Sequence, residues 1–441
     1  MLSTGKKAPH RETERVITEY NIALRNVGKI NPASIQDYMD RGGYEALKKA
    51  LQIPSEKIVH DITQSGLRGR GGAGFSTGLK KKYTSQASCV LLECMRYIVC
   101  NADEGEPGTF KDRIIMEGDP HLLIEGMVIA AYGVGAERGY IYIRGEYHQS
   151  ITMIRNALAH AHAHGFLGNN ILGSGFSLDI EIKLGAGSYL CGEELTLLES
   201  LEGKRGYPRI KPPFPAESGL FGKPTLINNV ETLSHIPAIM INGARWYRQL
   251  GTEMSPGTKI FTISGDVKNP GYAEVEMGVS LSDLIYRVAG GMKDGKPFKA
   301  ALLGGAAGTF VPESLLDVSM DFDALKEKGA VLGSGAVIVM SNDQSILTML
   351  DSILRFFEHE SCGKCVPCRV GTKQLVDLLE KLKGADDKRS DHIDALVYQS
   401  ELMAKTALCP LGQSPVLAIN SAVRYFRDEL ETTQISQSRC R

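Results

Sequence analysis

The strongest chemical signal in the sequence is a group of closely spaced cysteines. Cys362, Cys365 and Cys368 follow one another with two residues between neighbours, and Cys409 is followed by a proline further along the chain. Three such thiolates can turn toward one centre and a distant fourth can complete the site, as in iron–sulfur proteins. Structural zinc is the alternative, although zinc sites usually pair two separate cysteine knuckles. The spacing predicts a [4Fe-4S] cluster on these four cysteines.

A glycine-rich loop predicts binding of a phosphate. Residues 66–80 read GLRGRGGAGFSTGLK and contain the pattern G-x-G-x-x-G. A Rossmann dinucleotide motif needs a strand before this pattern, whereas residues 58–63 have a helical pattern, so the loop fails that test. Glycines still let backbone N–H groups approach an anion, and Arg70 and Lys80 add positive charge. The alternative is a plain surface loop.

Polar segments follow the predicted strands. Residues 101–113, NADEGEPGTFKDR, come after the apolar run 97–100, and residues 185–194, GAGSYLCGEE, come after the alternating segment 176–182. Ligands of open parallel sheets bind at the carboxyl ends of strands, where carboxylates can accept hydrogen bonds from ribose or ribityl hydroxyls. A third segment, NNVET at 228–232, offers amides suited to the edge of a flavin ring. Solvated turns and helix starts are the alternatives.

Two other groups of reactive side chains carry no predicted site. His160, His162 and His164 end a predicted helix just before a glycine, where the helix dipole favours imidazolium, so a metal site is disfavoured. Cys191 lies in a glycine-rich turn without a neighbouring histidine that could activate it.

The elements that must position these residues alternate between strand and helix. Strand patterns at 97–100, 140–144 and 176–182 are separated by helical patterns at 119–134 and 150–164. This order predicts a Rossmann-like parallel sheet with right-handed crossovers, an α/β fold.

The remaining segments predict further parts of the fold. A proline-rich strap at 203–224 is rigid, because proline does not fit a helix interior or a central strand. Strand patterns near 259–265, 272–276, 299–303 and 336–340, with a helix at 281–289, predict a ubiquitin-like β-grasp unit. Helical patterns beyond 341 predict a four-helix bundle. We expect domains at 1–60 (helical segment), 61–245 (α/β), 246–341 (β-grasp) and 342–441 (bundle with the cluster).

Composition excludes several classes of protein. The 441 residues carry 50 Lys and Arg against 51 Asp and Glu, which disfavours nucleic-acid binding, and the 43% hydrophobic content argues against disorder. No apolar stretch follows the charged N-terminus, and the apolar run at 122–136 is shorter than the roughly 20 residues of a membrane helix. We expect a cytoplasmic protein whose nine cysteines stay reduced.

Together these motifs resemble the flavin-carrying, NADH-oxidising subunit of respiratory complex I, and related diaphorase subunits of soluble hydrogenases and formate dehydrogenases. The resemblance covers about residues 35–430 and includes ESLEGKRGYPRIKPPFPA at 199–216, KPTLINNVETL at 223–233 and ESCGKCVPCR at 360–369. It implies FMN and one [4Fe-4S] cluster as cofactors, NADH and NAD+ as substrate and product, and the three-domain fold outlined above.

The resemblance also assigns roles to individual residues. It implies that FMN is bound by Gly69, Arg70, Gly71, Gly72, Lys80, Asn101, Asp103, Glu104, Tyr189, Gly192, Glu193, Asn228, Asn229 and Thr232. It implies that the nucleotide is bound by Gly74, Phe75, Tyr83, Glu106, Glu194, Lys211 and Phe214, with the aromatic rings as walls for adenine. Glu193 and Glu194 are the candidate catalytic residues, expected to speed the handling of NAD+.

The expected function is that of an NADH dehydrogenase module, part of an NADH:quinone oxidoreductase. Hydride passes from NADH to FMN, and electrons pass singly to the cluster and onward to quinone through complex I. The implied partners are an E-type 2Fe-2S subunit and a large, G-type iron–sulfur subunit, in a hydrophilic arm peripheral to the inner membrane.

Two alternatives remain at this stage. One is a diaphorase subunit of a soluble NAD-linked hydrogenase or formate dehydrogenase; such chains often carry extra fused domains, and their absence favours complex I. The other, from a different class, is a zinc-binding interaction module.

The chain departs from the family pattern at three places. Lys81 stands where the family usually has tryptophan, and Tyr83 stands where phenylalanine is common, so stacking is expected to survive. Leu-Thr at 195–196 replaces the usual Thr-Ala, which moves a hydroxyl at a helix start. The loop at 84–96 is longer than expected and carries two cysteines.

Overall fold

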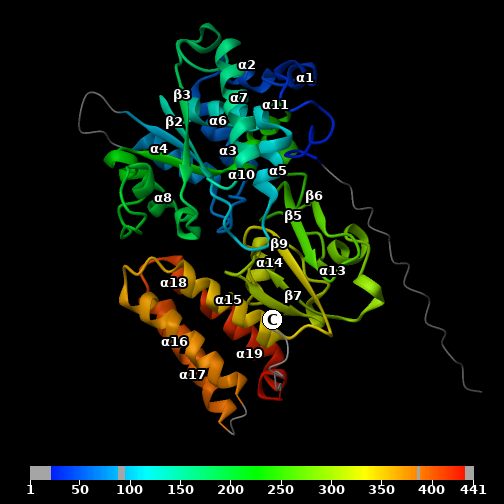
Figure 1. Cartoon of the computed structure of the whole chain (residues 1–441). Coiled ribbons are helices and arrows are strands. Elements are labelled where there is room, and N and C mark those ends of the chain that lie inside the picture. Colours follow the sequence, from blue (N-terminus) through cyan, green and yellow to red (C-terminus); the bar gives the residue numbers. More distant parts are fainter. Residues whose placement is uncertain (1–20, 88–94, 385–387, 433–441) are drawn as a thin grey trace, which may run out of the picture.

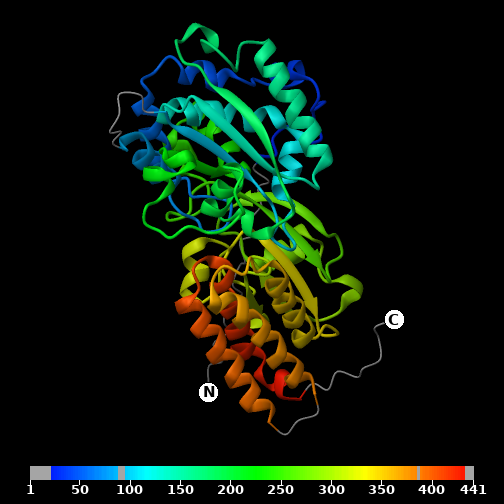
Figure 2. The same cartoon turned by 60° about the vertical axis from the view of Figure 1, so that its left-hand side comes forward.

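The computed structural model describes residues 21–87, 95–384 and 388–432. An α/β unit, a β-grasp unit and a helical bundle are arranged along the long direction of the molecule, with the β-grasp unit in contact with both others (Figures 1 and 2). In Figure 1 the α/β unit lies at the top and the orange and red bundle at the bottom. Cys89, Cys94 and Cys440, to which the sequence assigns no role, lie outside the described residues.

The α/β unit is built on a parallel sheet with the strand order β3-β2-β1-β4. Its strands are β1 (Tyr97–Ala102), β2 (Arg138–Arg144), β3 (Asp179–Gly185) and β4 (Thr225–Asn229). The first three confirm the expected strand, helix, strand pattern. The fourth was not predicted, because its apolar run is short and ends in two asparagines. Since β4 pairs with β1 on the side opposite β2, the sheet has a switch point between β1 and β4.

Helices cover both sides of this sheet (Figure 1). Those of the N-terminal part and the α/β unit are α1 (Ile35–Asp40), α2 (Glu45–Ala50), α3 (Ser55–Ser65), α4 (Thr77–Gln86), α5 (Lys111–Gly118), α6 (Pro120–Val134), α7 (His148–Ala163), α8 (Glu194–Leu201), α9 (Pro215–Ser218), α10 (Val230–Ser234), α11 (Ile236–Asn242) and α12 (Ala244–Tyr247). The long apolar run predicted as a helix is α6, which is buried on every side. Asp119 caps its start by accepting a hydrogen bond from the backbone N–H of Leu122.

The β-grasp unit has a mixed five-stranded sheet with the order β6-β5-β9-β7-β8. Its strands are β5 (Thr258–Gly265), β6 (Gly271–Glu276), β7 (Phe298–Leu303), β8 (Thr309–Pro312) and β9 (Ala336–Ser341), and its helices are α13 (Leu281–Asp283), continued by a π-helical turn, and α14 (Phe322–Glu327). Four of these strands match the expected positions. The short edge strand β8 was not predicted.

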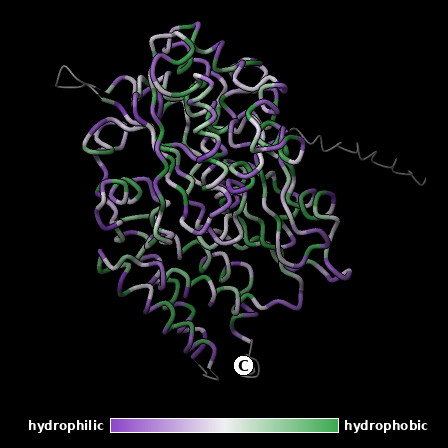
Figure 3. Tube along the Cα trace, turned by 45° about the horizontal axis from the view of Figure 1, so that its top comes forward, coloured by the Kyte–Doolittle hydropathy of each residue, from purple (hydrophilic) through white to green (hydrophobic). Residues whose placement is uncertain are grey.

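The C-terminal bundle matches the predicted helices and adds one short turn. Its helices are α15 (Ile346–Glu360), α16 (Val366–Lys383), α17 (Arg389–Thr406), α18 (Pro410–Gln413) and α19 (Pro415–Thr432). Apolar side chains spaced one helical turn apart, such as Leu350, Ile353 and Phe357, fill its core. Figure 3 shows hydrophobic and hydrophilic residues alternating along the turns of these helices. Within the described ranges, no helix is both long enough and apolar enough to cross a membrane.

Candidate functional site: a cavity at the sheet switch point beside the cysteine cluster

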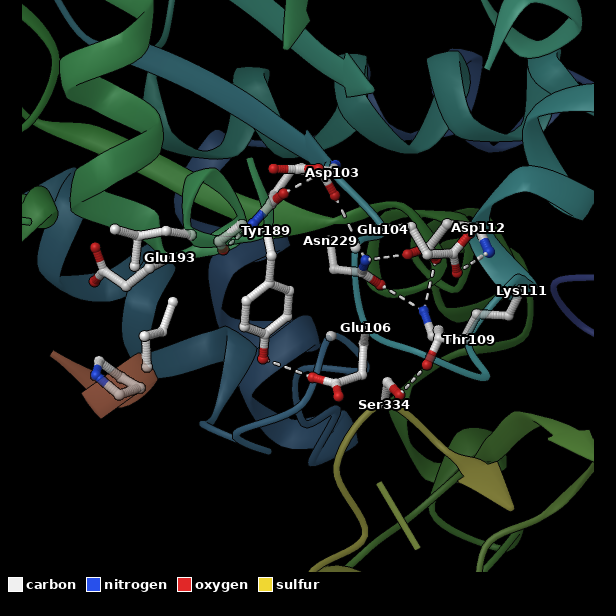
Figure 4. Close-up of a pocket in the computed structure, with 17 residues that line it drawn as sticks. Asp103, Glu104, Glu106, Thr109, Lys111, Asp112, Tyr189, Glu193, Asn229 and Ser334 are labelled. Atoms are coloured by element: carbon white, nitrogen blue, oxygen red, sulfur yellow. Dashed lines mark hydrogen bonds and ion pairs between the residues drawn. The ribbon is translucent and has the colours of Figure 1, made fainter. Parts of the chain in front are cut away.

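A cavity opens at the carboxyl ends of β1 and β4, at the switch point of the sheet (Figure 4). It is lined by Gly71, Asn101, Asp103, Glu104, Gly105, Glu106, Thr109, Lys111, Asp112, Tyr189, Leu190, Gly192, Glu193, Asn229, Ser334, Pro410 and Leu411. We call this the switch-point cavity. All three structural units contribute to it, because Ser334 belongs to the β-grasp unit and Pro410 and Leu411 begin α18 of the bundle.

Eight of the fourteen residues expected to bind FMN line this cavity. Gly71, Asn101, Asp103, Glu104, Tyr189, Gly192, Glu193 and Asn229 do so, whereas Gly69, Arg70, Gly72, Lys80, Asn228 and Thr232 lie outside its lining. Of the residues expected to bind the nucleotide, Glu106 lies in the lining as well. The sequence segments after β1 and β3 therefore converge on one site, as the switch-point rule predicts.

The inner wall of the cavity is formed by residues that follow β1. The side-chain amide of Asn101 donates to the carbonyl of Gly192 at 2.8 Å, which ties the turn after β3 to the end of β1. The carboxylate of Glu104 accepts from the backbone N–H groups of Asp112 at 2.8 Å and Arg113 at 3.1 Å, at the start of α5. Burial raises the pKa of Asp103 and of Glu104 to about 7.

A buried ion network forms part of this wall and was not predicted. The ammonium group of Lys111 lies 2.6 Å from a carboxylate oxygen of Asp112 and 3.0 Å from one of Glu231. The side chain of Asn229 donates to Asp112 at 2.6 Å and accepts from Lys111 at 3.2 Å. Burial opposes the charge of Lys111, but the carboxylates outweigh it and raise the lysine pKa. The network fixes the amide of Asn229 at the cavity; its only sequence signal was KDR within the acidic segment.

Tyr189 connects the cavity to the bundle. Its hydroxyl donates to Glu106 at 2.7 Å, and its backbone N–H donates at 2.9 Å to Glu360 at the end of α15. The other oxygen of Glu106 accepts from the backbone N–H of Ala307 in the β-grasp unit at 3.1 Å. Burial raises the pKa of Glu106. The three units are thus joined by hydrogen bonds at the cavity itself.

At the outer rim, Glu194 is held between two lysines. Lys80 and Lys211 each place their ammonium nitrogen 2.8 Å from a different oxygen of Glu194. Burial alone would raise the pKa of Glu194, but the two cations lower it to about 2. This carboxylate is therefore ionised throughout the physiological pH range. Lys211 also lies 3.0 Å from Glu193.

Glu193 is the N-cap of α8. One of its oxygens accepts from the backbone N–H groups of Leu195 and Thr196, at 3.0 and 2.9 Å, and from the hydroxyl of Thr196 at 3.0 Å. The helix-start hydroxyl that the Leu-Thr departure put in question is therefore supplied one position later, by Thr196.

Three exposed aromatic side chains lie around α4. Phe75 precedes this helix, Tyr83 belongs to it, and Phe214 precedes α9, which packs against α4. The exposed fractions of these residues are 48%, 53% and 52%, so their rings are accessible for stacking. All three were expected to contact the adenine ring.

Arg70 and Lys80, the two charged residues of the glycine loop that were expected to bind a phosphate, do not line the cavity. Arg70 is fully buried, and its guanidinium donates to the carbonyls of Pro256 at 2.7 Å and Thr258 at 2.9 Å. Lys80 pairs with Glu194 at the rim. The loop itself must be glycine-rich where it approaches the sheet, since a Cβ on Gly71 would lie 3.0 Å from that of Asn229.

Packing against the β-grasp unit explains the glycine at position 74. A Cβ on Gly74, which has a positive φ of 62°, would lie 2.6 Å from the ring of Phe322 in the β-grasp unit.

Asn228 is buried beside the cavity lining, and its side-chain oxygen has no hydrogen-bond partner in the described chain. An amide oxygen left unpaired at this place fits a polar group of a ligand. The amides and carboxylates of the cavity therefore suit the polar edge and hydroxyl groups of FMN.

The four predicted cluster ligands gather at the top of the bundle. Cys365 is the N-cap of α16, Cys368 lies in its first turn, and Cys409 is the N-cap of α18. These three and Cys362 belong to the bundle core or pack against it, and none of the four forms a disulfide among the described residues. A Cβ on Gly412 would lie 3.3 Å from the sulfur of Cys368, which shows how closely α18 covers it. Sulfur ligands at a helix N-terminus suit an anionic cluster.

The three histidines near the end of α7 lie as the sequence predicts. Among the described residues, no group of three or more His, Cys, Asp and Glu side chains is spaced to hold one metal ion. His160 and His162 lie in the last turn of α7 and His164 is its C-cap, as expected from the sequence.

The chain matches known protein families along most of its length. Residues 62–238 match the model of the Nuo51 FMN-binding domain, residues 260–307 match the SLBB domain, and residues 348–433 match the NADH-ubiquinone oxidoreductase-F iron–sulfur binding region. The chain is 45% identical over 424 residues to an F-type subunit of NADH-quinone oxidoreductase from Rhizobium meliloti, covering 95% of this chain and 98% of that protein.

One hydrogenase subunit has the same sequence identity to this chain, and a solved hydrogenase structure contains a chain with a similar fold. The chain is 45% identical over 422 residues to the NADP-reducing hydrogenase subunit HndC of Solidesulfovibrio fructosivorans, covering 96% of this chain and 85% of that one. A crystal structure of NAD+-reducing [NiFe]-hydrogenase in the H2-reduced state contains a chain that superimposes with a TM-score of 0.80 and 34% identity, covering 95% of this chain and 68% of that chain. The chain therefore belongs to the family of F-type subunits of NADH-quinone oxidoreductase and their hydrogenase relatives, oxidoreductases that carry an FMN-binding domain and a [4Fe-4S] region.

Proposed function

We propose that the switch-point cavity holds FMN and that NADH enters from the outer rim, between the exposed aromatic side chains. The contact of Pro410 and Leu411 with this cavity carries the proposal, because these residues directly follow the cluster ligand Cys409. FMN, when bound, supplies the chemistry of accepting a hydride from NADH and releasing electrons singly. A cavity walled by the two residues that follow Cys409 gives those electrons a short way out.

The residues of this chain would bind and orient the two nucleotides. For FMN we propose Gly69, Arg70, Gly71, Gly72, Lys80, Asn101, Asp103, Glu104, Tyr189, Gly192, Glu193, Asn228, Asn229 and Thr232. For NADH we propose Gly74, Phe75, Tyr83, Glu106, Glu194, Lys211 and Phe214. Cys362, Cys365, Cys368 and Cys409 would hold the cluster. The proposed domains are 61–245, 246–341 and 342–441, after an N-terminal segment at 1–60.

Glu193 and Glu194 are the proposed catalytic pair. Glu194 is ionised and can accept hydrogen bonds from nucleotide hydroxyls, but two lysines already hold it. NADH that binds Glu194 must share it with Lys80 and Lys211, which then come to lie beside the nucleotide. Their positive charges favour the pyrophosphate. Glu193 keeps its cap of α8 and so fixes the position of its neighbour.

We propose that the assembly is complex I, with an E-type 2Fe-2S subunit and a large, G-type iron–sulfur subunit as partners. The chain would then sit on the peripheral arm at the inner membrane and send electrons to quinone. The hydrogenase relatives support a second candidate, a diaphorase subunit of a soluble NAD-linked hydrogenase. Purification of the native complex separates the two, since membrane-arm subunits accompany the chain in one case and a [NiFe] subunit in the other.

An NADH:ferricyanide reductase assay on the purified assembly tests the function. We expect one FMN, four iron atoms and four acid-labile sulfides in the chain, and faster turnover with NADH than with NADPH. A preparation with one zinc per chain and no flavin would overturn the proposal.

A further inference from the structure

The loop that carries the cluster cysteines touches the proline-rich strap (203–224). Lys364 stands between Cys362 and Cys365, and its ammonium group donates to the carbonyl of Pro208 at 2.8 Å. The same nitrogen lies 5.5 Å from the centre of the Tyr207 ring. One lysine of the bundle therefore makes a charge-assisted hydrogen bond and a cation–π contact with the strap.

The strap passes from buried to exposed residues next to the point where Lys364 contacts it. Pro208 is buried, whereas the segment 210–214 is exposed, and it includes Lys211 and Phe214. No regular helix or strand covers 204–214, and its prolines lack N–H donors, so contacts with other parts of the chain must hold its shape. Whatever fixes Pro208 sets where the exposed segment begins.

Other contacts hold the strap from its own unit. Arg209 pairs with Glu199 and, at 2.8 Å, with Glu202, both at the end of α8. Lys211 reaches Glu193 and Glu194 at the rim of the cavity. These contacts leave the strap attached to the α/β unit alone, whereas the contact with Lys364 attaches it to the bundle that holds the cluster.

We propose that Lys364 is a positioning residue for the nucleotide. It fixes Pro208 and Tyr207 against the cluster loop and so presents Lys211 and Phe214 to NADH. The inference rests on the proposed function, because those two residues are the proposed nucleotide contacts. It adds that the affinity for NADH depends on a residue of the cluster loop that itself touches neither nucleotide nor flavin.

The test uses the full chain in its native assembly with Lys364→Gln, which keeps a polar side chain but shortens it by one bond and removes its charge. We expect the Kd for NAD+, measured by calorimetry without turnover, and the KM for NADH to rise about three- to tenfold. We expect kcat to change less than twofold. Amide hydrogen exchange in 204–214 should become at least several-fold faster in the nucleotide-free protein.

Control variants separate positioning from general damage. Lys364→Arg should restore most of the affinity and the protection. Lys373→Gln removes the charge of an exposed lysine on α16 that makes no ion pair or side-chain hydrogen bond in the described chain, and it should change neither quantity. If Lys364→Gln loses iron, Tyr207→Leu replaces it, because it breaks the cation–π contact without altering the cluster loop. Tyr207→Leu must also raise the Kd for NAD+ and the rate of amide hydrogen exchange in 204–214.

The inference is overturned if Lys364→Gln, with its iron retained, binds NAD+ within twofold of the parent chain and leaves exchange in the strap unchanged. Lys211→Gln distinguishes this failure from failure of the proposed function. If Lys211→Gln weakens NAD+ binding while Lys364→Gln does not, the nucleotide site stands and the role of Lys364 falls. If neither variant affects NAD+ binding, both the proposed nucleotide site and the role of Lys364 are rejected.

Discussion

The two sides of the switch-point cavity use the same residue types in opposite ways. The inner wall consists of Asp103, Glu104, Lys111 and Asp112, and the outer rim consists of Lys80, Glu193, Glu194 and Lys211. On the inner wall, burial dominates and raises the pKa of the two carboxyls after β1 to about 7. At the rim, two lysines dominate and lower the pKa of Glu194 to about 2.

This difference separates structural charge from charge available to a ligand. Lys111 is almost inaccessible, and its partners are equally buried, so its ion pairs hold the wall together. Lys80 and Lys211 keep about a third of their side-chain surface exposed, so their ion pairs can open and re-form around a nucleotide. The inner wall should therefore respond to mutation in stability, and the rim should respond in binding.

Replacing Lys111 is expected to give the largest effect. Lys111→Met leaves Asp112 buried without the cation it pairs with, while Glu231 keeps its ion pair with Lys259, and loss of one partner of a buried ion pair costs about 3–5 kcal/mol. Chemical denaturation of the chain measures this loss. As the matched rim variant, Lys211→Met should cost less than about 1 kcal/mol, because surface ion pairs contribute little. Equal losses in the two variants would abolish the distinction between wall and rim.

A buried lysine without partners should behave in the opposite way to Lys111. Lys81 is fully buried on α4, its ammonium group has no hydrogen-bond partner in the described chain, and burial lowers its pKa to about 7. Lys81→Met should therefore stabilise the chain by about 1–4 kcal/mol at neutral pH. The unfolded chain keeps this proton up to about pH 10.5, so the gain shrinks as the pH rises from 7 toward 10.

Thermal denaturation at pH 7 and at pH 9.5 measures both parts of this prediction. Lys82→Met, at the neighbouring exposed position, should change the midpoint little at either pH. A destabilised Lys81→Met variant would show that the ammonium group has a favourable partner, for instance a bound phosphate, and that Lys81 belongs with the ligand-binding lysines.

The sequence predicted the edge of the sheet where the site lies, because apolar runs at 97–100 and 176–182 are followed at once by acidic and glycine-rich segments. The cysteine spacing is an equally local signal, whereas the aromatic residues were assigned only through the family resemblance. The strand β4 escaped prediction because five residues, two of them asparagines, form a strand only by pairing with β1.

The residues that sequence reasoning missed are those that need distant partners. Lys111 acts through Glu231, which lies 120 positions away, and Ser334 and Pro410 reach the cavity from other units. The direction of the Arg70 side chain was equally hidden. A glycine-loop arginine suggests a phosphate, but here the carbonyls of Pro256 and of Thr258, the first residue of β5, accept its hydrogen bonds. No pattern within the loop encodes those acceptors.

Loss of the rim carboxylate should affect binding more than stability. Glu194→Gln removes the ionised acceptor proposed for NADH, so the Kd for NAD+ and the KM for NADH should rise about ten- to hundredfold. Calorimetry and steady-state kinetics measure the two constants. Glu181→Gln, which disrupts an exposed ion pair with Lys183 on β3, is the control and should change neither. Unchanged substrate and product affinity in Glu194→Gln would remove this residue from the site.

The smallest expected effect is a difference in pH dependence between wall and rim. Burial raises the pKa of Asp103 from its usual value of 3.8 to about 7, so the folded chain binds a proton that the unfolded chain has released. Asp103 therefore favours folding most at low pH, and this contribution falls as the pH rises from about 4 to 7. Because the side chain is partly exposed, we expect a loss of only about 1 kcal/mol.

Denaturation of the flavin-free chain between pH 5 and 8 checks this prediction. Asp103→Asn should remove part of the decline in stability with pH and be more stable than the parent at pH 8. Glu194→Gln should leave the slope unaltered, since a carboxyl whose pKa is lowered to about 2 is ionised in both the folded and the unfolded chain above pH 5. If Glu194→Gln changes the dependence of stability on pH and Asp103→Asn does not, the carboxyl that titrates in this range lies at the rim and not on the inner wall.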